Sequence, residues 1–229
     1  MVALAGVVPG PGRDLSLNRT IAEATLDAAA QAGITRVLLA SSSAVYGAGE
    51  AMAEDAPPAP VNAYGVAKRE MEAACAPWRA RGMEICCLRI GNVAGADALL
   101  LNVVERRGAI VIDRIADGGG PVRSYIGPAS LAAVLATLCR HAGPLPDMLN
   151  IAAPQPVAMT ALAQAAGARY ETRPARGTSA DHPRLPPSRR AAPFCPRRQH
   201  SRGNGPPMAH EQPRLSRGRR YLPQPRRST

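Results

Sequence analysis

Short apolar runs alternate with helical patterns through residues 1–171 of this 229-residue chain. Runs that contain almost no polar residue are typical of strands covered on both faces, as in a parallel sheet. Strands that alternate with helices predict an α/β domain. The predicted strands are 2–5, 36–40, 85–90, 109–112 and 148–152, and the predicted helices are 18–32, 63–82, 99–104, 130–139 and 158–166.

Local signals mark where two of these helices begin and end. Gly33 follows the first helical pattern and is predicted to end it, because glycine readily adopts the left-handed conformation after a helix. Asn62 precedes the second pattern and is predicted to cap it. The Gly- and Pro-containing segment 41–61 is predicted to be a loop.

The pattern stops at residue 172, where the composition changes abruptly. Residues 172–229 contain 14 Arg, 11 Pro, no Lys, no Ile or Val and two acidic residues, which gives this segment a charge of +12. The whole chain carries +11, so residues 1–171 carry −1. A segment with so little apolar surface cannot offset the entropy of ordering it. We therefore predict a folded domain at 1–171 and a disordered basic Arg/Pro-rich tail at 172–229.

The composition excludes several classes of protein. No apolar stretch approaches the roughly 20 residues that a membrane span needs, and no basic segment precedes the apolar start as in a secretory signal. The five cysteines show no CxxC or Cys/His spacing, so neither a zinc site nor a disulfide scaffold is expected. The prediction is a cytoplasmic protein with reduced core thiols, no metal and no membrane partner.

A serine cluster and a Tyr-x-x-x-Lys pair carry the chemistry. Ser41-Ser42-Ser43 follows the second predicted strand, and Tyr64 and Lys68 share one helical face because they are four residues apart. A lysine ammonium beside a phenol is expected to lower its pKa, which makes tyrosine a usable general acid/base. The alternative is that the pair is the polar end of a packing face. The serine cluster upstream makes the catalytic interpretation the more specific one.

The order of these motifs resembles the extended short-chain dehydrogenases/reductases, specifically the NAD-dependent epimerase/dehydratase family that acts on nucleotide sugars. The resemblance covers roughly residues 2–167. It rests on Leu4-Ala5-Gly6, Ser41 to Gly47, Tyr64 to Lys68, Leu88-Arg89-Ile90-Gly91-Asn92, Arg123-Ser124-Tyr125-Ile126 and Leu149-Asn150-Ile151. It implies a partial Rossmann-type parallel sheet with a remnant of the substrate lobe.

The resemblance also implies a role for each matching residue. Tyr64 would be the catalytic acid/base, Lys68 would hold the nicotinamide ribose, and Ser42 would bond the reacting sugar oxygen. The implied cofactor is NAD, with NADP possible. Its remaining contacts would be Leu4, Ala5, Gly6, Ala40, Ser41, Ile90 and Gly91, and the substrate contacts would be Ser43, Asn92 and Arg123, while Asn18 matches a structural asparagine at a helix start.

Two departures from the family pattern bear on activity. The glycine-rich turn that cradles the cofactor's pyrophosphate does not occur, because Gly6 to Gly12 is interrupted by prolines. The resemblance implies that the chain begins at the family's fourth strand. Where the family has Arg-Asp-x-x-His-Val, this chain reads Arg123-Ser124-Tyr125-Ile126-Gly127-Pro128, which leaves the substrate class open. We expect weak NAD binding and little or no activity from this chain alone.

Other functions stay open from the sequence. An NAD(P)H-dependent reductase of the same family would use the same Ser/Tyr/Lys residues. The basic tail would bind nucleic acid only non-specifically, since it has few aromatic residues for stacking. A non-catalytic remnant would pair with a full-length relative or with a second copy, because members of the family commonly dimerise.

Overall fold

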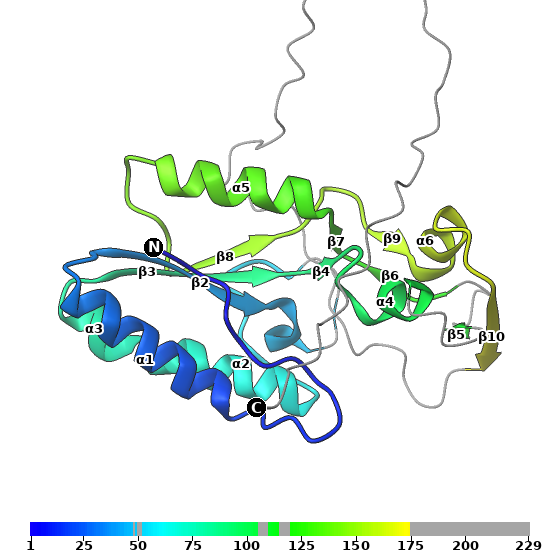
Figure 1. Ribbon diagram of the computed structural model, residues 1–229, viewed down its shortest axis with the longest axis horizontal. Coiled ribbons are helices and arrows are strands. Elements are labelled where there is room, and N and C mark those ends of the chain that lie inside the picture. The colour runs from blue at the N-terminus through cyan, green and yellow to red at the C-terminus, as the bar shows by residue number, and fades with distance from the viewer. Residues whose placement is uncertain (48, 50–51, 105–109, 115–119, 175–229) are drawn as a thin grey trace, which may run out of the picture. The chain divides into compact units, whose positions relative to one another are not determined.

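The computed structural model describes residues 1–47, 49, 52–104, 110–114 and 120–174 (Figure 1). The helices are α1 (Leu17–Gln31), α2 (Ala63–Ala74), α3 (Ala76–Ala80), α4 (Ala98–Val104), α5 (Pro128–Arg140) and α6 (Met159–Ala165), with a 3₁₀ helix η1 at Ser43–Tyr46. The strands are β1 (Val2–Ala3), β2 (Arg36–Ser42), β3 (Glu84–Ile90), β4 (Asn92–Val93), β5 (Ile110–Arg114), β6 (Val122–Arg123), β7 (Tyr125–Ile126), β8 (Met148–Ile151), β9 (Val157–Ala158) and β10 (Tyr170–Pro174).

A four-stranded parallel sheet in the order β1-β2-β3-β8 organises the described residues. This confirms the predicted α/β class with a parallel sheet. Ser42 at the end of β2 pairs in register with Ile90 at the end of β3, which pairs with Ile151 at the end of β8. Since all strands run the same way, these carboxyl ends meet at one edge, where open α/β sheets bind ligands.

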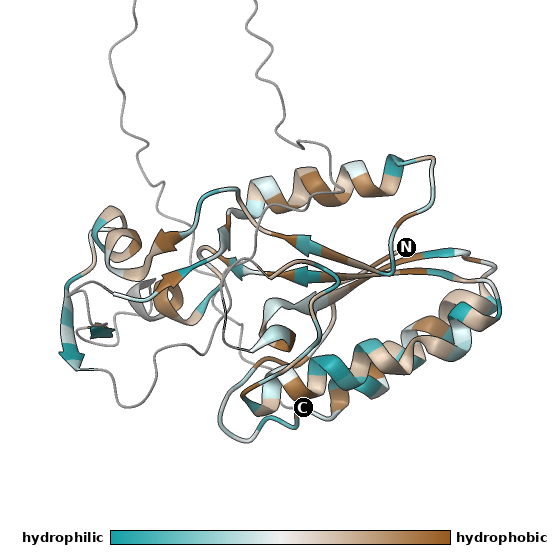
Figure 2. Ribbon diagram, turned by 180° about the vertical axis from the view of Figure 1, so that it is seen from behind, coloured by the Kyte–Doolittle hydropathy of each residue, from teal (hydrophilic) through white to brown (hydrophobic). Residues whose placement is uncertain are grey.

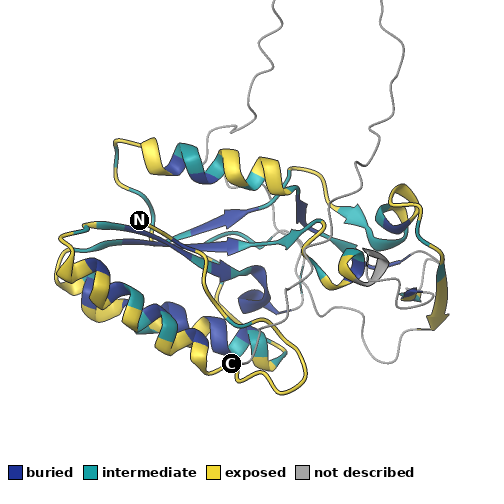
Figure 3. Ribbon diagram, viewed as in Figure 1, coloured by how far each residue is buried: buried dark blue, intermediate teal, exposed yellow. Residues whose placement is uncertain are grey.

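Helices cover both faces of this sheet (Figure 1). Helices α1, α2 and α3 pack on one face, around a cluster that includes Leu26, Met71 and Trp78. Helix α5 packs on the other face, where Leu135 and Leu138 lie in a second cluster. Figure 2 shows the hydrophobic strands between these layers, and Figure 3 shows them buried while the outer sides of the helices are exposed. Burial on both faces explains why β2 and β3 contain the apolar runs 37–40 and 85–88.

The predicted caps are confirmed. Gly33 has φ +68° after α1, and the amide of Ile34 donates to the Ala29 carbonyl at 2.9 Å. The Asn62 side chain accepts a hydrogen bond from the Gly65 amide at 2.8 Å at the start of α2. The single helix predicted over 63–82 is wrong, because the chain forms two helices that meet at Cys75. Pro77 explains the break, since a proline has no amide hydrogen to continue the helical bonds.

The prediction of a loop over 41–61 is wrong at its start. Strand β2 continues through Ser42, and Ser43–Tyr46 forms η1. The two-residue strands β4, β6, β7 and β9 were not predicted, because a two-residue strand has no period to recognise. They form two small ladders in which β4 pairs with β7 and β6 pairs with β9.

Strand β10 was also not predicted, and it crosses the predicted domain boundary at residue 171. Tyr170–Pro174 pairs in parallel with β5, and Arg173 forms an ion pair with Asp113 at 2.9 Å. Three residues assigned to the basic tail therefore belong to a strand. The rest of the predicted tail, with its nucleic-acid hypothesis, lies outside the described residues.

The cysteines follow the prediction only in part. Cys75, Cys86 and Cys87 are buried free thiols, but Cys139 on α5 is exposed, so it is not a core thiol. Cys195 lies outside the described residues. Within the part of the chain that the structure describes, no helix is both long and apolar enough to cross a membrane.

Candidate active site

The carboxyl end of β2 places two of the predicted serines. Ser42 is the last residue of the strand and caps η1, since its Oγ accepts a hydrogen bond from the Ala44 amide at 3.2 Å. Ser43 is the first residue of η1 and is buried. The half-buried Ser42 is therefore the more accessible hydroxyl of the two at this strand end.

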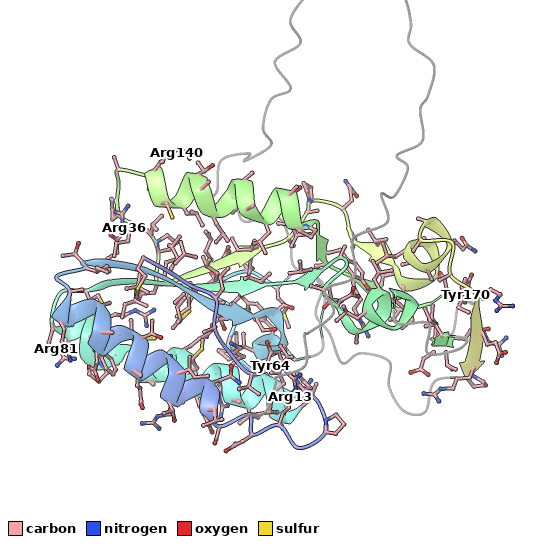
Figure 4. The ribbon with its side chains drawn as sticks, in the orientation of Figure 1. Arg13, Arg36, Tyr64, Arg81, Arg140 and Tyr170 are labelled. Atoms are coloured by element: carbon pink, nitrogen blue, oxygen red, sulfur yellow. The ribbon has the colours of Figure 1, made fainter. Side chains whose placement is uncertain are left out.

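A glycine allows the first turn of α2 to lie against η1. A Cβ built on Gly65 would overlap the Ala44 carbonyl oxygen and lie 2.8 Å from the Pro60 Cβ. Only glycine tolerates this separation. The close approach brings the neighbouring Tyr64 toward Ser42, whose side chain is near enough to lower the pKa of the phenol. Figure 4 shows Tyr64 near the start of α2.

Lys68 lies one turn further along α2, and it is the only lysine in the sequence. Its side chain is buried, and its Nζ donates to the Ala40 carbonyl of β2 at 3.0 Å. The same nitrogen lies 5.9 Å from the centroid of the Tyr64 ring. The structure thus brings together Ser42, Tyr64 and Lys68, the three predicted catalytic residues.

The electrostatics of the pair differ from the prediction. Burial raises the pKa of Tyr64 above 10.0, and the nearby Ser42 side chain acts in the opposite direction. The expectation that Lys68 lowers the pKa of Tyr64 below its ordinary value is therefore wrong for the free chain. The physical reason is that loss of water around the phenol outweighs the favourable contacts. Burial also lowers the pKa of Lys68 below 10.5.

We predict that Ser42→Ala raises the pKa of Tyr64 further, because the variant loses the side-chain hydroxyl that now lowers it. The measurement is an alkaline titration of ¹³C-labelled tyrosine by NMR, with the Tyr64 signal assigned through Tyr64→Phe. Ser43→Ala is the matched control and should leave the Tyr64 midpoint unchanged. An equal midpoint in Ser42→Ala and the parent chain would contradict the assigned contact.

A buried ion pair lies one turn beyond Lys68. The Nη2 of Arg89 on β3 donates to Glu72 Oε2 at 2.8 Å, and its Nε donates to Glu72 Oε1 at 3.1 Å. The Ser41 hydroxyl also donates to Glu72 Oε1, at 2.6 Å. The side chains of Arg89 and Glu72 are only 3% and 4% exposed. Ser41, expected beside the nicotinamide ribose, thus has its hydroxyl engaged by Glu72.

The ion pair extends into a wider polar network. The Arg89 guanidinium lies 4.6 Å from the centroid of the Tyr46 ring, and the Tyr46 hydroxyl donates to Asn150 Oδ1 at 2.8 Å. Asn150 in turn donates from its Nδ2 to the Met52 carbonyl at 2.8 Å. The motifs that contain Arg89 and Asn150 predict no partner for either side chain. The available signal was an arginine inside an apolar strand, which requires a buried counter-charge.

The predicted contacts at the end of β3 lie beside two short ladders. A Cβ on Gly91 would lie 2.5 Å from the Ser124 carbonyl oxygen, so the chain passes closely here. The Asn92 amide donates to that same carbonyl at 2.8 Å. This bond places the backbone of Asn92, on β4, beside Ser124, the residue that follows Arg123 of β6.

The loop after β1 lies against the lysine. A Cβ on Gly6 would lie 3.2 Å from Lys68 Nζ and 2.9 Å from Asn18 Oδ1. The buried Asn18 holds this loop in place, since its side chain exchanges two hydrogen bonds with the backbone of Val7, at 2.9 and 3.1 Å. Leu4 and Ala5, which precede Gly6 in the sequence, are exposed.

These contacts fit one end of a dinucleotide. Around Lys68 the chain offers an ammonium, a phenol, a hydroxyl and a glycine backbone that leaves room, which suit a ribose and an aromatic ring. For the pyrophosphate, the described residues offer no glycine-rich turn that opens a helix: α1 begins at Leu17, after a loop, and its preceding Ser16 bonds to Asp14. The fit is therefore to the nicotinamide–ribose end.

Comparisons with known proteins identify the family of the chain. The sequence model described as the NAD dependent epimerase/dehydratase family matches residues 8–152. A UDP-glucose 4-epimerase from Azospirillum brasilense is 44% identical over 75 residues, which make up 31% of this chain and 22% of that enzyme. The chain therefore matches less than a quarter of the length of that curated relative.

Solved structures extend the similarity to most of the chain. The structure of MoeE5 in complex with UDP-glucuronic acid and NAD is 25% identical with a TM-score of 0.63, and the match covers 82% of this chain and 68% of MoeE5. A UDP-glucose 4-epimerase from Thermus thermophilus, in complex with NAD, shares the fold at 22% identity and a TM-score of 0.64, with the same two coverages. Because the family model covers more than half of the sequence, the chain belongs to the NAD-dependent epimerase/dehydratase family.

Proposed function

We propose that the chain carries the acid/base site of a nucleotide-sugar epimerase or dehydratase, with Ser42, Tyr64 and Lys68 as its catalytic residues. The observation that carries this proposal is the meeting of a strand-end hydroxyl, a phenol and the chain's only lysine at one edge of the sheet. The nucleotide sugars named for the similar structures support the substrate class.

Each residue has a distinct role in the proposed reaction. The Ser42 hydroxyl bonds the reacting sugar oxygen, and Tyr64 exchanges a proton with that oxygen. Tyr64 must lose its own proton before it can accept one, and the positive charge of the nearby Lys68 ammonium favours this loss. NAD, when bound, supplies the group that takes a hydride from the sugar carbon and returns it.

The surrounding residues would hold the ligands. Lys68 and the backbone at Gly6 and Ala40 would contact the nicotinamide ribose, with Ile90 and Gly91 near the ring. Leu4, Ala5 and Ser41 would contribute through their backbone. Asn92 and Arg123 would contact the nucleotide sugar, where a guanidinium suits a phosphate. A reductase of the same family would use the same catalytic residues.

The first test is NAD binding, followed through the single lysine. With ε-¹³C-lysine the chain gives one lysine side-chain signal, which we expect to shift on titration with NAD at millimolar but not micromolar concentrations. Weak binding is expected because no Gly-x-x-Gly-x-x-Gly segment occurs in the sequence to cradle the pyrophosphate. No shift at any NAD concentration would refute the site, and saturation at micromolar NAD would refute the argument from the missing turn.

The second test concerns the phenol. The parent rate is expected to be low, so it is measured with excess NAD and UDP-glucose. We expect Tyr64→Phe to lower this residual rate of NADH formation or sugar conversion about 100-fold or more, the contribution typical of a positioned general acid/base. Tyr170→Phe is the control, since Tyr170 lies on β10, outside the proposed site. An unchanged rate in Tyr64→Phe would exclude Tyr64 as the proton carrier.

A further inference from the structure

The carboxylate of Glu72 is held in place by residues from two strands of the sheet. Helix α2 places its carboxylate one turn after Lys68, and two other elements hold it there: Arg89 from β3 and Ser41 from β2. Three charged side chains, Lys68, Glu72 and Arg89, are thereby buried together, each at most 4% exposed. Burying charge is costly unless each charge has a partner.

Glu72 is the negative charge available to Lys68. The groups near the ammonium are Tyr64, Glu72 and the Met71 sulfur on its own helix, Cys87 on β3, the Ala40 carbonyl on β2 and the uncharged Gly6. The pKa of the Cys87 thiol is raised well above 9.0, chiefly by its contact with Cys75 and by burial, so this thiol is neutral at pH 7. The raised pKa of Tyr64 keeps the phenol neutral as well.

The geometry shows what fixes this carboxylate. Its two oxygens accept three hydrogen bonds, from Arg89 Nε, Arg89 Nη2 and the Ser41 hydroxyl. A bidentate guanidinium contact fixes the orientation of a carboxylate better than a single bond does. Arg89 is itself held over the Tyr46 ring and donates from its Nη1 to the Glu54 carbonyl at 3.3 Å. The carboxylate therefore cannot turn away from α2.

We propose that Glu72 is a positioning residue for Lys68: its carboxylate, fixed by Arg89 and Ser41, supplies the buried negative charge that keeps the lysine ammonium protonated beside Tyr64. This inference rests on the proposed function for its catalytic meaning, since Lys68 acts there as a cation. Glu72 contacts neither substrate nor cofactor in this scheme. It acts only through Lys68.

The experiment titrates Lys68 in the full chain, using the single ε-¹³C-lysine signal in the absence of any ligand. In Glu72→Gln the Lys68 midpoint should fall below that of the parent chain, because a neutral amide no longer offsets the burial that already lowers this pKa. Glu72→Asp keeps the charge and should restore the midpoint at least in part. A merely structural role for Glu72 would not give this charge-dependent pattern.

Glu84→Gln is the matched control. Glu84 also forms an ion pair from β3, with Arg36 at 2.5 Å, but it lies at the opposite end of that strand from the catalytic residues. Its variant should leave the Lys68 midpoint unchanged. An unchanged midpoint in folded Glu72→Gln, or an equal fall in Glu84→Gln, would overturn the proposal.

A second variant covers the case in which Glu72→Gln does not fold. Glu72→Gln/Arg89→Gln removes both charges of the ion pair and leaves two amides that can bond to each other. The Lys68 midpoint should still fall, since Cys87 and Glu72 are the groups that raise it, and the double variant removes the carboxylate and leaves the thiol in place. No fall would again overturn the proposal. These titrations need no NAD. A parent chain that fails to respond to NAD would therefore refute the proposed function without deciding the role of Glu72.

Discussion

Gly65→Ala is expected to destabilise the chain by about 3 kcal/mol, the upper part of the range for overpacked sites. Helix propensity alone predicts the opposite sign, because alanine in a helix is favoured over glycine by about 1 kcal/mol. The packing decides the outcome here. An added Cβ would overlap the Ala44 carbonyl oxygen, a backbone atom that cannot rotate away, and would press on Pro60.

The measurement is the free energy of unfolding by urea, followed by circular dichroism. Gly127→Ala is the matched control, because Gly127 precedes α5 with φ −75°, and a Cβ there would meet nothing within 4 Å. This control should change stability by no more than about 1 kcal/mol, the cost of replacing a glycine N-cap by alanine. If Gly65→Ala instead stabilises the chain, as propensity predicts, then α2 does not approach η1 as closely as described. In that case the packing would not bring Tyr64 close to Ser42.

The sequence predicts the central layers of this fold because their signals are local and repeated. A strand such as Glu84–Ile90, buried on both faces, is an apolar run whatever its neighbours are. The start of α2 is likewise marked by Asn62, whose side chain needs only the amide of Gly65, three residues on. Tyr64 and Lys68 could be placed on one face for the same reason: their relation depends on helical spacing alone.

What could not be predicted depends on contacts between distant segments. Strand β10 exists because it pairs with β5, 60 residues earlier in the register, and nothing in the sequence Tyr-Glu-Thr-Arg-Pro indicates that pairing. The predicted direction of the Tyr64 pKa shift was wrong for a related reason. Helical spacing identifies Lys68 as a neighbour of Tyr64. The burial that raises the pKa of the phenol comes from the packing of α2 against the rest of the chain.

The buried ion pair between Arg89 and Glu72 was not predicted, although Arg89 belongs to one of the motifs of the sequence. Arg89 lies in a motif at the end of β3. Its partner Glu72 lies 17 residues earlier in the sequence, on helix α2. A sequence shows that an arginine within an apolar strand needs a counter-charge, but it does not show which of the acidic residues provides it. The sheet register and the packing of α2 together make that choice.

The second large effect is expected at this ion pair. Arg89→Leu should destabilise the chain by about 3 to 5 kcal/mol, because it leaves the carboxylate of Glu72 buried without its cation. The pair is 3% and 4% exposed, so solvent does not screen the loss. Unfolding by urea measures the effect. Arg19→Leu is the control: it breaks a surface pair with Glu23 on α1, where Arg19 is 60% exposed, and should leave stability nearly unchanged.

The double variant Glu72→Leu/Arg89→Leu separates an orphaned charge from lost packing. Replacing a buried ion pair by apolar side chains is often neutral, so most of the stability lost in Arg89→Leu should return. Recovery should stop short of the parent chain, because the Ser41 hydroxyl and the Glu54 carbonyl then lack their partners, each at a cost of about 1 to 3 kcal/mol if it stays dry. A double variant as unstable as Arg89→Leu would show that the guanidinium stabilises the chain by packing on Tyr46 and not by neutralising Glu72.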